Sequence, residues 1–105
     1  MIEYTVKAYA NGDIYWFLNG VRHREDGPAV EESDGTKSWY FNGKLHREDG
    51  PACEFSDGYK EWYFNGEDLT EEEFFNRTKK HTVTIDGQEI QISEESFNEL
   101  KKSLN

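Results

Sequence analysis

Two histidine–aspartate pairs are the residues of this chain whose types and spacing could support chemistry. His23 precedes Asp26 by three residues, and His46 precedes Asp49 by the same interval. Imidazole and carboxylate groups bind transition metals, and together they can act as a general acid and base. An active site is normally used once per domain, whereas a structural contact recurs in every repeat. The repetition therefore favours a structural role over a recurring partner contact or a metal site. We expect each aspartate to cap its own Asp-Gly-Pro turn and each imidazole to pack between hairpins.

The sequence carries no other signature of catalysis or cofactor binding. It has no glycine-rich phosphate loop, no Cys-x-x-Cys, no His-Glu-x-x-His and no serine in a nucleophile elbow. The single cysteine, Cys53, cannot form an intramolecular disulfide, and we expect it to be a buried apolar side chain in a reducing cytoplasm. The sequence therefore predicts a protein that is not an enzyme and that uses no cofactor and no metal.

An internal repeat of 23 residues organises the first two thirds of the chain. The segment His-Arg-Glu-Asp-Gly-Pro-Ala occurs unchanged at residues 23–29 and 46–52, and two complete units span 11–33 and 34–56. Half units precede and follow them. Four other sets of residues keep the same period: Trp16, Trp39 and Trp62; Asn19, Asn42 and Asn65; Gly20, Gly43 and Gly66; Gly12, Gly35 and Gly58.

Each repeat has the turn signals and the alternation of an antiparallel meander. We expect two-residue turns with positive φ at the Asn-Gly or Asp-Gly pairs 11–12, 34–35 and 57–58. Continuous strands should follow at 37–41 and 60–64, each ending in a second Asn-Gly turn. Alternation along these strands places the tryptophans on one face, so we expect them to form a structural row in the core. The Arg-Glu pairs after each histidine should be solvated surface charges.

The repeat pattern ends after residue 68. Thr70 and Glu73 form a capping box that predicts a short helix, and a hairpin is expected at 81–92 around the turn Asp86-Gly87. Ser93 then caps a helix predicted over 94–104. The expected fold is α+β but mainly β. It consists of an antiparallel β-hairpin repeat array at 1–68 and a helical and ββα cap at 69–105, together in one compact domain.

The charge of the chain restricts its partners. It has 22 acidic and 12 basic side chains, a net charge of -10 at pH 7, which argues against direct binding to nucleic acid or to an anionic membrane. No apolar run approaches the roughly 18 residues of a membrane span. A protein partner, or a basic surface that normally holds nucleic acid, fits better. The carboxylates predicted to contact it, rather than only to solvate the surface, are Glu31, Glu32, Asp34, Glu54, Asp57, Glu71, Glu72 and Glu73.

The repeat resembles a known family. The 23-residue period and the element Trp-Tyr-Phe-Asn-Gly-Lys-Leu-His-Arg-Glu-Asp-Gly-Pro-Ala at 39–52 are similar to divergent MORN-like repeats of bacterial and phage proteins. This resemblance covers about residues 11–68, and it implies a row of β-hairpins used as a scaffold or a protein-binding surface. Residues 83–96 look like a small ββα module at the ends of phage accessory proteins.

These observations lead to three functional hypotheses. The first is a non-enzymatic, phage-type inhibitor that acts in the cytoplasm of a bacterial host. It would bind a bacterial defence or host protein, as anti-CRISPR proteins do. The second is a structural or scaffold repeat module that forms homo-oligomers or tethers a partner protein. The third is a carbohydrate or small-ligand binder that uses exposed tryptophan and tyrosine rings.

Overall fold

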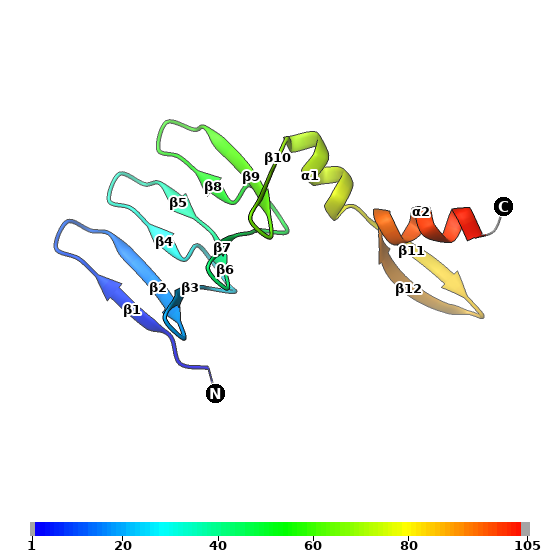
Figure 1. The fold of residues 1–105 in the computed structure, drawn as a ribbon, viewed down its shortest axis with the longest axis horizontal. Coiled ribbons are helices and arrows are strands. Elements are labelled where there is room, and N and C mark those ends of the chain that lie inside the picture. The colour runs from blue at the N-terminus through cyan, green and yellow to red at the C-terminus, as the bar shows by residue number, and fades with distance from the viewer. Residues whose placement is uncertain (1, 104–105) are drawn as a thin grey trace. The chain divides into compact units, whose positions relative to one another are not determined.

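The structure is a computed structural model that describes residues 2–103. The chain divides into two compact units, Met1–Thr70 and Glu71–Asn105, which are described separately. Figure 1 shows the first unit as β-hairpins lying side by side and the second as two helices with one hairpin. The predicted fold class is confirmed, because the chain is mainly antiparallel β-sheet with two short helices. No helix among residues 2–103 is long and apolar enough to cross a membrane.

The main sheet of the first unit has the order β1-β2-β4-β5-β8-β9-β10. Three short strands are not on this path: β3 pairs with β2 at its side, and β6 and β7 pair in a sheet of their own. Neighbouring strands are antiparallel throughout. The ten strands are β1 (Thr5–Ala8), β2 (Ile14–Leu18), β3 (Val21–Arg22), β4 (Val30–Glu31), β5 (Lys37–Ser38), β6 (Tyr40–Phe41), β7 (Lys44–Leu45), β8 (Cys53–Glu54), β9 (Lys60–Phe64) and β10 (Glu67–Leu69).

The strand predicted over 37–41 is divided at Trp39, while β9 is continuous as expected. Trp39 is the point at which the chain changes its pairing partner. Its N–H donates to the carbonyl of Ala52 at 2.7 Å, and its carbonyl accepts from the N–H of His46 at 3.0 Å. Residues before Trp39 therefore pair with β8, and residues after it pair with β7. The segment interrupted at Trp39 thus joins the main sheet to the short hairpin of β6 and β7, which we call the return hairpin.

The turns between strands are of two kinds, and only one kind matches the prediction. At Asn42 and Gly43 φ is 50° and 82°, so both central residues are left-handed, as a two-residue type I′ turn requires. The other turns were predicted to be of the same kind, and that prediction is wrong. At Asp34-Gly35 only Gly35 has positive φ, and the N–H of Glu32 donates to the carbonyl of Thr36. This is a three-residue loop that ends in a left-handed glycine.

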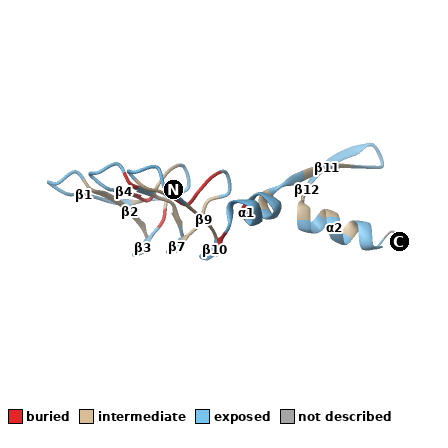
Figure 2. Ribbon diagram, turned by 90° about the horizontal axis from the view of Figure 1, so that it is seen from above, coloured by how far each residue is buried: buried red, intermediate tan, exposed pale blue. Residues whose placement is uncertain are grey.

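The apolar core of the first unit is small. Its buried members are Ala29, Val30, Ala52, Cys53 and Leu69, and Figure 2 shows how few buried positions this thin layer has. Cys53 is buried as predicted, and burial raises the pKa of its thiol. The three tryptophans are only half-buried, in contrast to the core row that was expected. A one-layer sheet cannot bury large rings on both faces, so contacts between repeats must supply much of its stability.

The second unit matches the elements predicted for it. It contains α1 (Glu71–Thr78), β11 (Lys80–Ile85), β12 (Gln88–Ser93) and α2 (Glu94–Ser103). The Oγ of Ser93 accepts the N–H of Ser96 at 3.1 Å, which caps α2 as expected. The last predicted residue of this helix, Leu104, lies outside the described residues.

One face of this hairpin is aliphatic, and it is only partly covered. Val83 lies opposite Ile90, so both project from one face of the hairpin. On the same face the ring of His81 stacks on Phe97 of α2, with centroids 4.2 Å apart. The hydrogen bond from His81 lowers the pKa of Glu94 below its usual value. Towards the hairpin tip Ile90 is exposed, so α2 covers only the base of this face.

A substitution at a buried alanine tests the packing of the first unit. Ala52 has no exposed surface, so Ala52→Leu should overpack the sheet and lower the free energy of unfolding by about 1–3 kcal/mol. The control is Ala10→Leu, which enlarges an exposed loop residue. Urea unfolding followed by tryptophan fluorescence measures both. Equal effects of the two substitutions would contradict the described packing.

Candidate functional site

The two repeated histidines hold adjacent repeats together. The Nδ1 atom of His23 accepts the backbone N–H of Asn42 at 2.9 Å, and Nδ1 of His46 accepts that of Asn65 at the same distance. A ring nitrogen can accept a hydrogen bond only when it carries no proton. Each histidine is therefore a neutral acceptor for the Asn-Gly turn of the next repeat, and its structural role follows from this bond.

The rings of the same histidines lie in a ladder of aromatic side chains. The centroid of His23 is 6.2 Å from that of Tyr4 and 4.5 Å from that of Phe41. His46 lies 5.9 Å from Phe41 and 4.7 Å from Phe64. The prediction that the imidazoles pack between hairpins is confirmed. Only 2% of His23 is exposed, so its ring is a main packing element of the unit.

Backbone hydrogen bonds reinforce each of these junctions. The N–H of Gly43 donates to the carbonyl of Arg22 at 2.8 Å, and the N–H of Arg24 donates to the carbonyl of Tyr40 at 3.2 Å. The next junction repeats the first contact, since Gly66 donates to Leu45 at 2.8 Å. The return hairpin of each repeat is thus fixed to the preceding repeat on both sides of the histidine contact.

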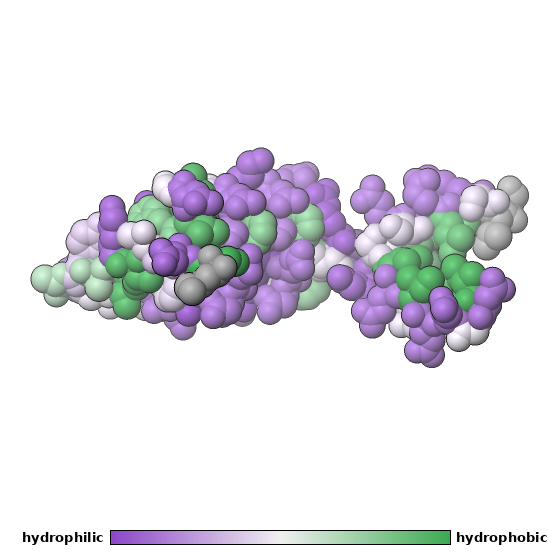
Figure 3. Space-filling view, turned by 90° about the horizontal axis from the view of Figure 1, so that it is seen from below, coloured by the Kyte–Doolittle hydropathy of each residue, from purple (hydrophilic) through white to green (hydrophobic). Residues whose placement is uncertain are grey.

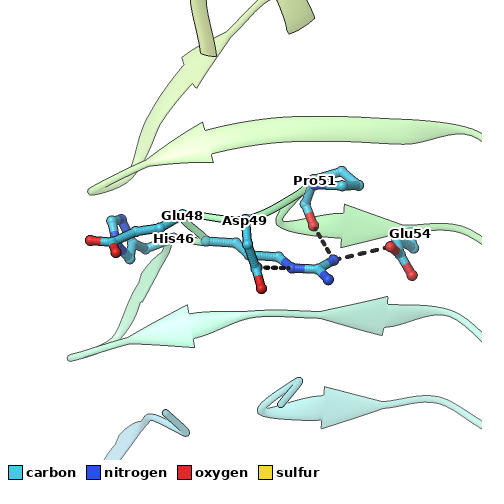
Figure 4. Close-up of polar contacts among 6 residues, drawn as sticks. His46, Glu48, Asp49, Pro51 and Glu54 are labelled. Atoms are coloured by element: carbon cyan, nitrogen blue, oxygen red, sulfur yellow. Dashed lines mark hydrogen bonds and ion pairs between the residues drawn. The ribbon is translucent and has the colours of Figure 1, made fainter. Parts of the chain in front are cut away.

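The aspartates do not cap their own turns, and that prediction is wrong. Asp26 accepts from Nε of Arg24 at 2.9 Å, and Asp49 accepts from Nε of Arg47 at 2.9 Å. This hydrogen bond with Arg24 lowers the pKa of Asp26. The turn is closed by the arginine instead, because Nη1 of Arg47 donates to the carbonyl of Pro51 at 3.0 Å (Figure 4).

The arginines were predicted to be solvated, and they are instead largely covered. Each side chain is 20% exposed. The guanidinium of Arg24 lies over the ring of Trp16 at 4.0 Å, and that of Arg47 lies over Trp39 at 3.8 Å. A planar guanidinium that stacks on a ring and binds a carboxylate combines cation–π and ionic contacts. Each arginine therefore shields one half-buried tryptophan.

Two of the predicted contact carboxylates belong to these arginine clusters. Glu54 accepts from Nη1 of Arg47 at 3.0 Å, as Figure 4 shows. In the preceding repeat Glu31 lies 3.8 Å from Nη1 of Arg24. Both glutamates are half-buried, so their charges are partly neutralised within the unit. They are less suited to a partner than their sequence positions suggested.

Two further predicted carboxylates stabilise loops. Asp34 accepts the N–H of Thr36 at 2.9 Å, and Asp57 accepts that of Tyr59 at 3.0 Å. The backbone hydrogen bond from Thr36 lowers the pKa of Asp34. Glu32 is exposed in the same loop as Asp34. These loops form a row, since Oγ of Ser56 donates to Asp34 at 3.4 Å across one repeat.

The remaining predicted carboxylates, Glu71, Glu72 and Glu73, lie in the second unit. They are exposed and occupy the first turn of α1, where negative charge interacts favourably with the helix dipole. The eight predicted residues therefore do not form a single cluster. Five of them belong to the hairpin array, and three begin a helix of the other unit.

A groove between the two identical His-Arg-Glu-Asp-Gly-Pro-Ala segments is a concave feature that the sequence did not predict. We call it the inter-repeat groove, and it has a volume of about 840 Å³. Its apolar wall is aromatic, and its rim carries four carboxylates. The aromatic residues are Trp39, Phe41, His46 and Phe64, and the carboxylates are Glu25, Asp26, Glu48 and Asp49.

The rim carboxylates are far more exposed than Glu31 and Glu54. Their side chains are 56% exposed at Glu25, 82% at Asp26, 71% at Glu48 and 86% at Asp49. The signal for this groove was present in the sequence, because two identical segments must present the same side chains one repeat apart. The sequence favoured a structural role for this segment over a recurring partner contact or a metal site, and it did not indicate a groove.

The groove carries more negative than positive charge. Four carboxylates line it against two arginines, Arg24 and Arg47, whose guanidinium groups already bind Asp26 and Asp49. Within residues 2–103, no three His, Cys, Asp or Glu side chains are grouped so that they could hold a metal ion. The arrangement is suited to binding cationic groups beside aromatic rings.

Comparison with protein-family models, curated proteins and solved structures finds no match to this chain. The resemblance to MORN-like repeats therefore stays a prediction, as do the phage-type origin and the identity of a partner. The inter-repeat groove and the distribution of charge are the features from which a function can be proposed.

The histidine junction can be tested without removing the ring. His23→Phe keeps an aromatic side chain but leaves the N–H of Asn42 without its acceptor, which should cost about 1–3 kcal/mol of unfolding free energy. Hydrogen exchange should become faster at the Asn42 amide. The second junction is the internal control, because Asn65 keeps its bond to His46. Unchanged protection of Asn42 would contradict the proposed junction.

A substitution at Asp34 tests the loop hydrogen bond through its pH dependence. Asn11 makes the same contact in the first loop, with the N–H of Asp13 at 3.0 Å, so Asp34→Asn should fold normally. The lowered pKa of Asp34 contributes stability that is present above about pH 4 and lost as the pH falls through its folded-state pKa. The variant should lose stability less steeply in that range. Urea unfolding from neutral to acid pH measures this, and identical slopes would contradict it.

Proposed function

We propose that this protein is a non-enzymatic, acidic protein-binding module that inhibits a bacterial protein. It would bind the basic surface that its partner uses for nucleic acid. A phage-type inhibitor of a bacterial defence system, comparable to anti-CRISPR proteins, is the form of this function that best fits the repeat resemblance and the charge. The observation that carries the proposal is the exposure of Glu25, Asp26, Glu48 and Asp49 around an aromatic groove.

The distribution of charge supports the same proposal. Residues 1–68 carry 14 acidic and 7 basic side chains, and residues 69–105 carry 8 and 5. Figure 3 shows hydrophilic side chains together with apolar patches on the face that it draws of each unit. An excess of negative charge attracts a basic partner at long range and raises the rate of association. Such attraction is weakened by salt, which distinguishes it from an apolar interface.

The organisation of the sheet also supports protein binding. The two junctions fix the repeats to one another through the histidines, so the rim carboxylates are held at set positions before a partner arrives. Binding groups that are already ordered lose less conformational entropy on association. A rigid acidic surface can therefore compete with nucleic acid, whose phosphates are also regularly spaced.

A scaffold function is the second candidate, and one observation favours it. The main sheet ends at β1 and at β10, so each of these strands has only one neighbour in the described structure. All four residues of β1 are exposed. A free strand edge is a template for pairing with another chain. Discrete oligomers that grow with concentration in light scattering would favour this function over inhibition.

The inhibitor proposal is tested by capture followed by competition. The full chain should retain a nucleic-acid-binding protein from a nuclease-treated bacterial lysate at low salt and release it at high salt. The purified partner should then lose its nucleic acid when this protein is added. Capture of a partner whose nucleic-acid binding is unaffected would contradict the inhibitory mechanism. Failure to retain any protein, together with self-association, would support the scaffold function instead.

A further inference from the structure

We infer that the inter-repeat groove binds an arginine-containing segment of a partner protein in the polyproline II conformation, with arginines at every third residue. This inference rests on the proposed protein-binding function and names the chemistry that would be recognised at the groove. It depends on three features of the described residues. They are the aromatic wall, the excess of carboxylates on the rim and the distance between equivalent positions of the two repeats.

The aromatic wall offers accessible ring surface to a cation. Phe41 is 40% exposed although it lies in the interior of the repeat array, between His23 and His46. Phe64 occupies the equivalent position one repeat later and also lines the groove. Ring faces attract cationic groups, and guanidinium groups stack on them more readily than ammonium groups. An arginine side chain laid into the groove would cover these rings.

The carboxylates on the rim provide the complementary charge. Glu25 and Glu48 are exposed, and Nε2 of His23 and of His46 lies 3.5 Å and 3.7 Å from their respective carboxylates. The neutral imidazoles leave the negative charge of both glutamates available. The guanidinium of a bound arginine could therefore donate hydrogen bonds to one of these glutamates while it lies against the aromatic wall.

The chain itself shows this mode of arginine binding. Arg47 stacks on Trp39 at 3.8 Å and donates to Asp49 at 2.9 Å, and Arg24 makes the same pair of contacts with Trp16 and Asp26. Ring, guanidinium and carboxylate thus form a repeated unit on this surface. A partner arginine would place a second guanidinium beside the arginine that each repeat already holds. Its carboxylate partner would be Glu25 in one repeat and Glu48 in the next.

The spacing of the repeats determines the spacing of the arginines. Equivalent strands of successive repeats are two positions apart in the sheet order, as β4 and β8 are. Two strand separations amount to about 10 Å. A polyproline II segment has three residues per turn and rises about 3.1 Å per residue, so its side chains at i and i+3 lie on one side about 9 Å apart. Such a segment, running across the hairpins, would place arginines at positions i and i+3 next to Glu25 and Glu48.

Two peptides of equal composition test this inference. One has arginine at every third position with proline between, and the other has the same arginines adjacent to one another. Titrated into the full chain at low salt and followed by tryptophan fluorescence, the spaced peptide should bind about tenfold more tightly than the clustered one. Equal affinities would overturn the spacing, and no saturable binding of either peptide would overturn the groove as an arginine site.

A matched pair of variants locates the binding. The double variant Glu25→Gln and Glu48→Gln removes two charges from the groove, and it should weaken binding of the spaced peptide about tenfold. The control, Glu3→Gln with Glu95→Gln, removes two charges from exposed residues outside the groove lining. It should bind the peptide almost as well as the unaltered protein. Equal weakening by both variants would show a general charge effect and overturn the inference.

The proposed function can fail or succeed independently of this inference. If the partner captured from lysate binds the Glu25→Gln and Glu48→Gln variant as tightly as the unaltered chain, the groove is not its binding site. The inhibitory function would then stand and the inference would be overturned. If the spaced peptide binds at the groove but no captured partner loses its nucleic acid, the arginine site would stand without the inhibitory function.

Discussion

The hydrogen bond from an Asn-Gly turn to the Nδ1 atom of a histidine is the contact on which the hairpin array depends. A one-layer sheet with five buried apolar residues has too little core to hold its repeats in register by burial alone. His23 and His46 each bind the next repeat through a ring nitrogen and through a tilted or edge-on ring contact with Phe41 or Phe64. Leu69 replaces the histidine in the third repeat, so this junction ends there.

The surface chemistry is a consequence of the same junctions. Because the segment after each histidine is identical, the two junctions place identical arginines, glutamates and aspartates one repeat apart. The arginines are used within the unit, where they cover Trp16 and Trp39, and the glutamates are left exposed. The regular spacing of negative charge beside aromatic rings is the feature on which we base the proposed binding of a basic protein. A flexible acidic chain of the same composition would lack that spacing.

The sequence predicted the elements well because turns and periodicity are local. The period of 23 residues, the turns at Asn42 and Asn65, the helix that follows Thr70 and the final hairpin all depend on neighbouring residues. The partners of Arg24 and Asp26 could not be predicted from neighbouring residues. The Arg24 guanidinium contacts a carboxylate, a tryptophan ring and a backbone carbonyl, and the local sequence does not show which of these it binds. The groove was missed because it requires the side chains of two repeats to be placed together. The loop at Asp34 was misassigned because Asp-Gly is compatible with both turn types.

The most direct test of the histidine junction is nuclear magnetic resonance of the imidazole nitrogens at neutral pH. Spectra that correlate ring protons with ring nitrogens report which nitrogen carries the proton. His23 and His46 should both be neutral with the proton on Nε2, and each Nδ1 should show a coupling across the hydrogen bond to the amide of Asn42 or Asn65. A proton on Nδ1 of either ring in the folded protein would contradict the account, because that nitrogen could not then accept the bond.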